Sequence, residues 1–267
     1  IDNVVKHIKK LNRQKPKRSA IISKPDFLMT MQHERILADK TVSAYLKISA
    51  GCSNKCTYCV IPPLRGPARS RKPDDILKEA QLLTQRGIKE IIITGQDTAA
   101  YGKDLRGRPS ISSLLKEMTN IKNLQWIRLL YSHPTHVDKE LLKTIATEKK
   151  ICSYLDLPIQ HIDDDILKAM NRKITSARIK EIIAQTREVI PGLALRTSII
   201  VGFPGETKKK FEQLLDFIVD TKFDHLGVFT YSREEGTKAA LLPACISEAE
   251  KERRRDILMQ EQAAISN

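Results

Sequence analysis

The sequence predicts an α/β fold, a partial (β/α)6 TIM-like barrel. The first observation behind this prediction is an alternation of short apolar runs with amphipathic helical patterns, which is typical of βα units. The second is that six such apolar runs occur along the chain. The third is size: the chain has 267 residues, 41% of them hydrophobic, and α/β barrels often reach this length as one domain.

The predicted strands are the runs richest in aliphatic and aromatic residues. They span Ala44 to Ser49, Glu90 to Thr94, Trp126 to Leu130, Tyr154 to Leu157, Ala194 to Val201 and His225 to Phe229. Because the carboxyl ends of the strands in such barrels carry the chemistry, we expect the functional residues directly after these runs.

Two helices between the strands have clear apolar faces. The first is predicted from Asp74 to Arg86, with Gly87 as its stop signal and an apolar face made of Ile76, Leu77, Ala80 and Leu83. The second carries a stripe at helical spacing, which we interpret as core packing and which consists of Phe211, Leu214, Leu215, Ile218 and Val219.

Three cysteines follow the first predicted strand, in the run Gly51-Cys52-Ser53-Asn54-Lys55-Cys56-Thr57-Tyr58-Cys59. Three thiolates can hold a cubane iron–sulfur cluster and leave its fourth iron open to another ligand. A structural zinc site usually needs four ligands in two pairs, and the remaining cysteines, Cys152 and Cys245, are isolated and predicted to be packed in the interior. Zinc or a redox pair of thiols remain alternatives, as do an RNA-binding module braced by a metal and a simple electron carrier.

Other unusual segments also fall at predicted strand ends. They are Gly95-Gln96-Asp97 after the second strand, Pro158-Ile159-Gln160-His161 after the fourth and Gly202-Phe203-Pro204-Gly205-Glu206 after the fifth. Each contains glycine, proline or a polar group where a strand must turn. Their common placement predicts a single site.

The C-x3-C-x2-C run, with an aromatic residue before its third cysteine, resembles the radical S-adenosylmethionine superfamily. The resemblance implies that Cys52, Cys56 and Cys59 hold one 4Fe-4S cluster whose open iron binds S-adenosylmethionine. Reductive cleavage of this cofactor would yield a 5′-deoxyadenosyl radical.

The same resemblance implies contacts to the cofactor. Tyr58 would lie beside its adenine, and Gly95, Gln96 and Asp97 would form the loop that meets its ammonium group. Gln160 and Arg196 would reach its ribose or carboxylate, with Arg172 as a further candidate, because a guanidinium can donate two hydrogen bonds to a carboxylate. Ser198 and Gly202 would belong to a strand that supports the adenine.

Several separated motifs are similar to the methylthiotransferases, which insert sulfur into a C–H bond and methylate it. These are Cys59-Val60-Ile61-Pro62-Pro63-Leu64-Arg65-Gly66, Gly95-Gln96-Asp97-Thr98, Leu155-Asp156-Leu157-Pro158-Ile159-Gln160-His161 and Tyr231-Ser232-Arg233-Glu234-Glu235-Gly236-Thr237. The last three of these motifs resemble the RimO type, whose substrate is an aspartate β-carbon of the twelfth small-subunit ribosomal protein. The alternative is the type that modifies isopentenyl-adenosine in transfer RNA.

The resemblance also implies a domain organisation. We expect residues 43 to 267 to form the radical SAM barrel with a C-terminal helix, and residues 1 to 42 to be a basic linker from an N-terminal domain that carries a second 4Fe-4S cluster. That domain and a C-terminal TRAM domain are expected to be absent, so this chain alone should not complete methylthiolation. Further expected partners are the ribosome and an electron donor such as flavodoxin or ferredoxin.

The net charge of +14 favours a polyanionic partner. Ten Lys or Arg and four acids lie between Ile1 and Lys40, and the loop after the cysteines adds Arg65, Arg69, Arg71 and Lys72. A solvated basic surface without a partner is the alternative. The apolar runs are too short to cross a bilayer, and no stretch resembles a signal peptide, so we expect a cytoplasmic protein without membrane contact.

Overall fold

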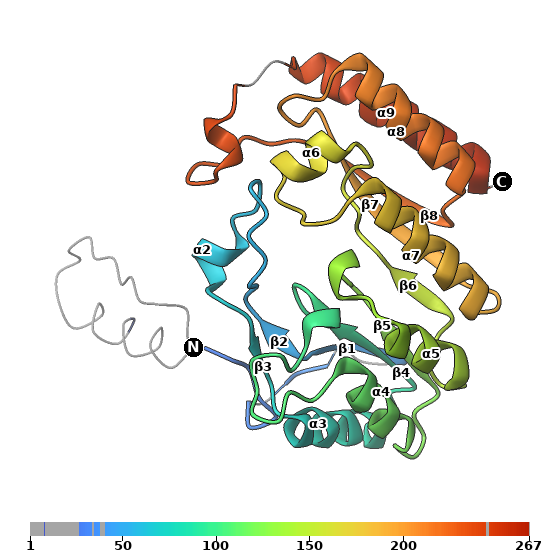
Figure 1. The fold of residues 1–267 in the computed structure, drawn as a ribbon. Coiled ribbons are helices and arrows are strands. Elements are labelled where there is room, and N and C mark those ends of the chain that lie inside the picture. The colour runs from blue at the N-terminus through green and yellow to red at the C-terminus, as the bar shows by residue number, and fades with distance from the viewer. Residues whose placement is uncertain (1–7, 9–26, 34, 38–40, 244–245, 267) are drawn as a thin grey trace.

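Six parallel strands form an open, curved sheet with helices on its outer side (Figure 1). The structure is a computed structural model that describes Ile8 and residues 27–33, 35–37, 41–243 and 246–266. The expected linker over residues 1 to 42 and the predicted packing of Cys245 therefore lie wholly or largely outside the described residues. Within the described part, no helix is long and apolar enough to cross a membrane.

The strands follow one another across the sheet in chain order. They are β1 (Ser43–Lys47), β4 (Glu90–Thr94), β5 (Trp126–Leu129), β6 (Tyr154–Asp156), β7 (Ala194–Val201) and β8 (His225–Thr230). Hydrogen bonds join β1, β4 and β5 into one half and β6, β7 and β8 into the other. A parallel bridge between Ile127 and Ile151 connects the halves. The predicted partial (β/α)6 barrel and all six of its strands are confirmed.

One predicted strand is divided in the structure. The run from Ala44 to Ser49 pairs with β4 through β1, and then β2 (Ser49–Ala50) pairs with the antiparallel β3 (Arg69–Ser70). Ile48 lies between them, where its N–H donates to the Thr94 carbonyl and its carbonyl accepts from the Arg71 N–H. This change of partner turns the chain into the cysteine run.

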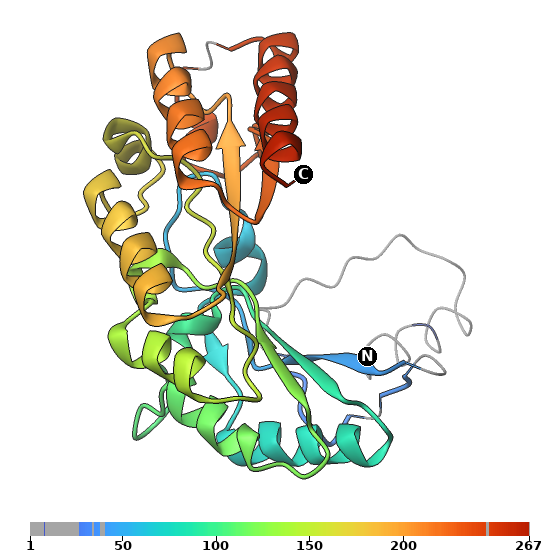
Figure 2. The same cartoon turned by 90° about the vertical axis from the view of Figure 1, so that its right-hand side faces the viewer.

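The helices comprise one short helix after the cysteine run, α2 (Ile61–Arg65), and those that form the outer layer, as Figure 2 shows from the side. The latter are α3 (Pro73–Gln85), α4 (Ile111–Thr119), α5 (Lys139–Thr147), α6 (Asp164–Ala169), α7 (Ser176–Val189), α8 (Lys208–Thr221) and α9 (Glu248–Ser266). Six of them start at a side chain that accepts a backbone N–H from the first turn, and these N-caps are Ser110, Asp138, Asp163, Thr175, Thr207 and Ser247.

The predicted apolar faces pack largely as expected. Ile76, Ala80 and Leu83 of α3 are buried against the sheet, and the helix ends before Gly87. In α8, Phe211, Leu214 and Ile218 are buried, but Val219 is 38% exposed and Phe217 takes its place in the core. The buried face of α8 is therefore shifted from the prediction, because the helix packs beside α9 and its side with Val219 faces solvent.

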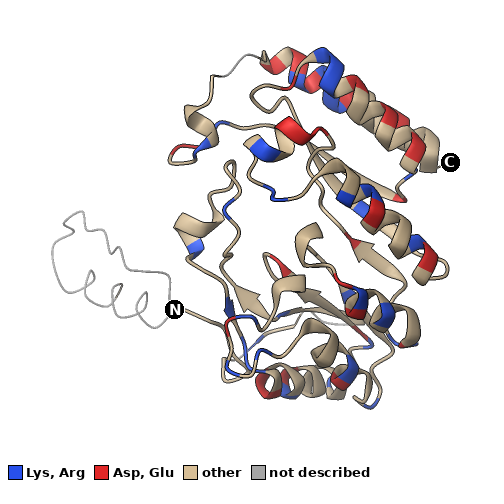
Figure 3. Cartoon of the chain, viewed as in Figure 1, with Lys and Arg blue, Asp and Glu red and all other residues tan. Residues whose placement is uncertain are grey.

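The basic loop after the cysteines is partly structural. Arg71 is buried and pairs with Asp75 and with Glu79 of α3, each at 2.6 Å. It therefore braces the barrel and is not available to an external polyanion. Along α8 and α9, basic and acidic residues are interleaved, so the positive charge is not concentrated on these helices (Figure 3).

Candidate active site

The cysteine run forms a loop between β2 and α2 that reaches across to the second half of the barrel. It starts at Gly51, whose φ of +80° and close approach to the Pro67 carbonyl leave no room for a side chain. Thr57 then makes the crossing: its N–H donates to the Met170 carbonyl at 3.1 Å, and its own carbonyl accepts from the Ala239 N–H at 2.9 Å. The loop, which leaves the first half of the sheet through β2, is thus bonded at Thr57 to two segments of the second half.

All three thiols of the loop, those of Cys52, Cys56 and Cys59, are half-buried and line one cavity of about 430 Å³. The cavity opens among the carboxyl ends of the strands. Of the other predicted cofactor contacts, it brings together Tyr58, Gln96, Gln160, Arg172, Arg196 and Ser198. Residues from opposite halves of the barrel therefore meet around the cysteines.

Arg172 is the buried cation beside the thiols. Its Nη1 lies 3.7 Å from Cys56 Sγ and 3.4 Å from the Tyr58 hydroxyl, and its Nη2 donates to the Pro158 carbonyl. Its Nε is buried and has no hydrogen-bond partner. Burial raises the pKa of the Tyr58 phenol, which keeps this hydroxyl protonated despite the nearby guanidinium.

Gln160 lines the cavity from a constrained backbone. Its φ of +71° is in the left-handed region, where residues other than glycine are uncommon. Its N–H donates to the Ser198 carbonyl and its carbonyl accepts from the Ile200 N–H, each at 2.9 Å. These two bonds to β7 fix Gln160 at the cavity wall.

Three predicted cofactor residues do not line this cavity. Gly95 packs against Ser49, so that a Cβ atom at Gly95 would lie 2.7 Å from the Ser49 hydroxyl. At Gly202 a Cβ atom would meet the stem of Lys251 at 2.3 Å, which places a helix side chain of α9 beside it. Asp97 is buried and faces an adjoining hollow.

Asp97 joins three loops through its carboxylate. Oδ2 accepts from Asn54 Nδ2 and pairs with His136 Nδ1, both at 2.7 Å, and Oδ1 accepts from the His133 N–H at 3.3 Å. Although burial opposes ionisation, the bond from His136 and the neighbouring charges lower the Asp97 pKa. Asp97 therefore ties the cysteine loop to the loop after β5.

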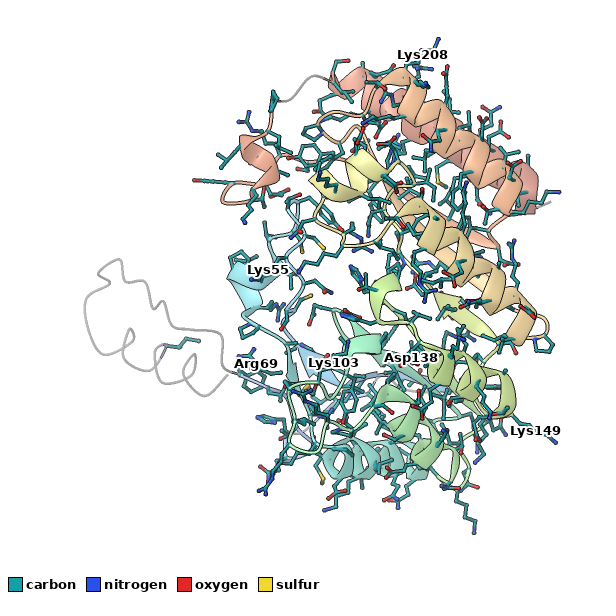
Figure 4. All side chains as sticks on the ribbon, viewed as in Figure 1. Lys55, Arg69, Lys103, Asp138, Lys149 and Lys208 are labelled. Atoms are coloured by element: carbon teal, nitrogen blue, oxygen red, sulfur yellow. The ribbon has the colours of Figure 1, made fainter. Side chains whose placement is uncertain are left out.

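Sequence reasoning missed Asn54, His133 and His136. The sequence does contain a signal for the two histidines, because they follow the end of a predicted strand in the run His133-Pro134-Thr135-His136. Burial is the main cause that lowers the pKa of His133 to about 3, and the nearby charge of Arg172 is the next largest. The neutral His133 ring accepts a hydrogen bond from the Thr135 N–H through Nδ1. The adjoining hollow, of about 510 Å³, also contains Lys55 and Lys103, which Figure 4 labels.

The residues present fit a cluster with S-adenosylmethionine. The thiols lie at one cavity, Arg172 stands beside them, and two buried polar atoms there, Gln96 Oε1 and Arg172 Nε, have no hydrogen-bond partner. Burial raises the pKa of the Cys52 and Cys59 thiols, and coordination to a metal would deprotonate them. In the described part of the chain, no three His, Cys, Asp or Glu side chains are arranged around a single ion. A cubane distributes its thiolates over separate irons, so its ligands need not converge on one point.

Cys152 is separate from this site. It precedes β6, at the end of the strand opposite the cavity, and is half-buried. Its pKa is raised by burial. Cys152 is thus less buried than the predicted interior packing implies, and it is not among the buried residues of the core.

Comparison with known proteins places the chain in a family. A family model described as the radical SAM superfamily matches residues 46–218. The chain is 52% identical to the ribosomal protein uS12 methylthiotransferase RimO of Syntrophus aciditrophicus and 51% identical to that of Geotalea uraniireducens. The matches cover 100% and 91% of this chain but only 59% and 54% of those relatives, so the chain spans little more than half of their length.

A solved structure agrees on the fold. Coproporphyrinogen III oxidase (HemN) from Escherichia coli, a radical SAM enzyme, superposes with a TM-score of 0.56 at 20% identity, covering 82% of this chain and 51% of that one. The family match includes the three cysteines and most of the strands that line the cavity. The chain belongs to the radical SAM superfamily.

Proposed function

We propose that this chain is the radical domain of a methylthiotransferase of the RimO type, acting on an aspartate of ribosomal protein uS12. The observation that carries the proposal is the single cavity in which the three thiols of Cys52, Cys56 and Cys59 meet Arg172 and Gln160. The substrate is inferred from relatives of 52% and 51% identity that are named for uS12. The transfer RNA alternative has no comparable support.

The residues of the chain have distinct roles in this proposal. The three cysteines would hold a 4Fe-4S cluster. Arg172, which donates to the Pro158 carbonyl, would bind the carboxylate of S-adenosylmethionine through N–H groups that include its unpartnered Nε. Gln96, Gln160, Ser198 and Tyr58 would surround the rest of the cofactor. When bound, the cluster and S-adenosylmethionine supply a radical able to abstract hydrogen from an unactivated carbon.

The proposal also has parts that lie outside this chain. We infer that a second cluster for sulfur delivery and a substrate-docking domain belong to further segments, and that an external protein such as flavodoxin or ferredoxin supplies electrons. The chain alone would then bind one cluster and leave uS12 unmodified. We place the reaction in the cytoplasm, where ribosomes are assembled.

The substrate is tested by offering a longer form of the enzyme, with both flanking domains, either uS12 or transfer RNA. The proposal expects a mass gain on uS12 and none on the RNA, as measured by mass spectrometry. A uS12 variant with asparagine at the target position should remain unmodified. A mass gain on the RNA alone would contradict the assignment.

A further inference from the structure

Two arginines line the cavity, and they lie at different places within it. Arg172 is beside the cysteines, with Nη1 3.7 Å from Cys56 Sγ. Arg196 lies on β7, whose alternation points Arg196, Ser198 and Ile200 to the cavity while Leu195, Thr197 and Ile199 are buried behind it. Ile200 packs in the same apolar cluster as Tyr58, next to Cys59.

The length of the strand separates Arg196 from the cysteine end. Four residues of β-strand span about 13 Å, so the Arg196 backbone is that far from Ile200. The methionine part of S-adenosylmethionine, bound at an open iron, would lie at the cysteine end within reach of Arg172. Arg196 therefore faces the region of the cavity that the cofactor carboxylate does not occupy.

Arg196 is held in place by Asp156 and by a side-chain hydrogen bond with Tyr154, and its guanidinium still has further N–H donors. Its Nη1 pairs with Asp156 Oδ2 at 3.1 Å, and the same Oδ2 accepts from the Tyr131 N–H at 3.1 Å. Asp156 is fully buried, whereas the Arg196 side chain is 33% exposed. A guanidinium has five N–H donors in a planar fork, so an arginine fixed on one side can still bind a second carboxylate.

Two exposed aromatic residues line the same cavity as Arg196. The exposed fraction is 46% for Tyr131 and 57% for Phe229. Tyr131 has a φ of +58°, a conformation that is costly for a bulky residue and that occurs most often at functional sites. The edge of the Phe229 ring lies beside Gly227, at an ordinary contact distance of 3.4 Å from where a Cβ atom would be.

We propose that Arg196 binds the carboxylate of the acidic substrate side chain, with Tyr131 and Phe229 on either side of its aliphatic part. Arg196 would then serve the substrate and not the cofactor contact that the sequence resemblance implied. A neutral amide of the same shape would leave the guanidinium with a poorer partner in a partly desolvated cavity, so the site would select an acid. This inference rests on the proposed function.

The test measures binding, separately from turnover. The chain is reconstituted with iron and sulfide, and equilibrium binding is measured for N-acetyl-aspartyl amide, N-acetyl-asparaginyl amide and S-adenosylmethionine. The wild type should bind the aspartyl probe about tenfold more tightly than the asparaginyl probe or better, as expected for charge-assisted hydrogen bonds. Arg196→Met should abolish this preference and leave the affinity for S-adenosylmethionine unchanged within about twofold, with Arg196→Lys intermediate because it keeps the charge but loses the fork.

Arg128→Met is the matched control. Arg128 is an ion-paired arginine of strand β5, which β6 separates from β7, and it does not line the cavity, so both affinities should be retained. Equal binding of the two probes by the wild type, or binding of neither, would overturn the inference. So would an Arg196→Met variant that loses S-adenosylmethionine and keeps the preference for aspartyl. Failure of the proposed function is distinguishable, because it would appear as a wild-type chain that produces no 5′-deoxyadenosine.

Discussion

At the scale of single residues, Asp97 determines how the cysteine loop is held. Its carboxylate accepts from Asn54, two residues after Cys52, and pairs with His136 in the loop after β5. Since Asp97 is 8% exposed, both interactions are largely removed from water. We infer that Asp97 positions the loop in the iron-free protein and does not itself contact the cofactor.

We therefore predict that Asp97→Ala destabilises the chain and impairs cluster assembly. Loss of an ionised partner from two part-buried hydrogen bonds should lower the free energy of unfolding by about 2 kcal/mol. Urea unfolding and iron content after reconstitution measure the two effects. Asp104→Ala is the control, because Asp104 lines the same hollow but is exposed, and its carboxylate accepts from the Ser70 N–H and not from the cysteine loop. Equal iron content in the two variants would contradict the positioning role.

His133 predicts a pH dependence of stability. Its pKa is lowered to about 3 from an ordinary value of 6.5, so below pH 6.5 the unfolded chain takes up a proton that the folded chain does not. Above pH 6.5 the ring is neutral in both states, and His133 does not affect the free energy of unfolding. As the pH falls from 6.5 toward about 3, protonation of the unfolded chain lowers the free energy of unfolding. The expected loss is about 2 kcal/mol on lowering the pH by about two units from that value. The free energy of unfolding is measured with urea at several pH values for the iron-free wild type, His133→Gln and the exposed control His225→Gln. It should depend less on pH in His133→Gln, whereas His225→Gln should behave like the wild type.

At the scale of elements, α9 anchors the strand ends behind the cavity. Arg254 donates to Glu206 Oε1 at 2.6 Å, and Glu206 also accepts from the Gly202 N–H. Lys251 donates to the Tyr231 carbonyl at 3.0 Å. The ends of β7 and β8 thus take their position from a helix that follows them in the chain.

Arg254→Ala should be strongly destabilising. It leaves Glu206, which is 2% exposed, without its cation, and breaking a buried ion pair costs about 3 to 5 kcal/mol. Arg255→Ala, on the exposed side of the same helix, should cost less than about 1 kcal/mol. Thermal or urea unfolding compares the two variants, and similar losses would contradict the anchoring role.

The strands and helices that could be predicted from the sequence are those whose patterns lie within one short run of residues. All six parallel strands were found, because period-2 and aliphatic patterns are properties of a few neighbouring residues. The break at Ile48 was not, because it depends on a switch of partner from β4 to β3. At the site, spacing identified the cysteines, whereas the Asn54, Asp97 and His136 network depends on three loops converging in space. The packing of Lys251 against Gly202 was also not predictable, because it brings together residues far apart in the chain.

At the scale of the whole molecule, the cysteine loop connects the two ends of an open barrel. The described strands β1 and β8 are not paired with each other. Instead, Thr57 bonds to Met170 and Ala239, and Asn171 Nδ2 donates to the Lys55 carbonyl at 2.7 Å. The loop that would hold the cluster therefore also joins the halves.

This connection predicts that the cluster stabilises the entire fold. A group that binds only the folded state raises stability by mass action, and thiolate ligands recruit the metal to that state. The reconstituted chain should unfold at a higher temperature than the iron-free chain, in a single transition. Chelation of the iron should reverse the difference, and an unchanged unfolding temperature would show that the loop is not coupled to the fold.

The central claim is that the three thiols and their cavity form a radical SAM site. Its most direct test is 5′-deoxyadenosine formation by the chain reconstituted with iron and sulfide in the absence of oxygen, then supplied with reductant and S-adenosylmethionine. We expect product from the wild type and from Cys152→Ala, whose thiol lies outside the cavity, and none from Cys56→Ala. No product from the wild type, or undiminished product from Cys56→Ala, would contradict it.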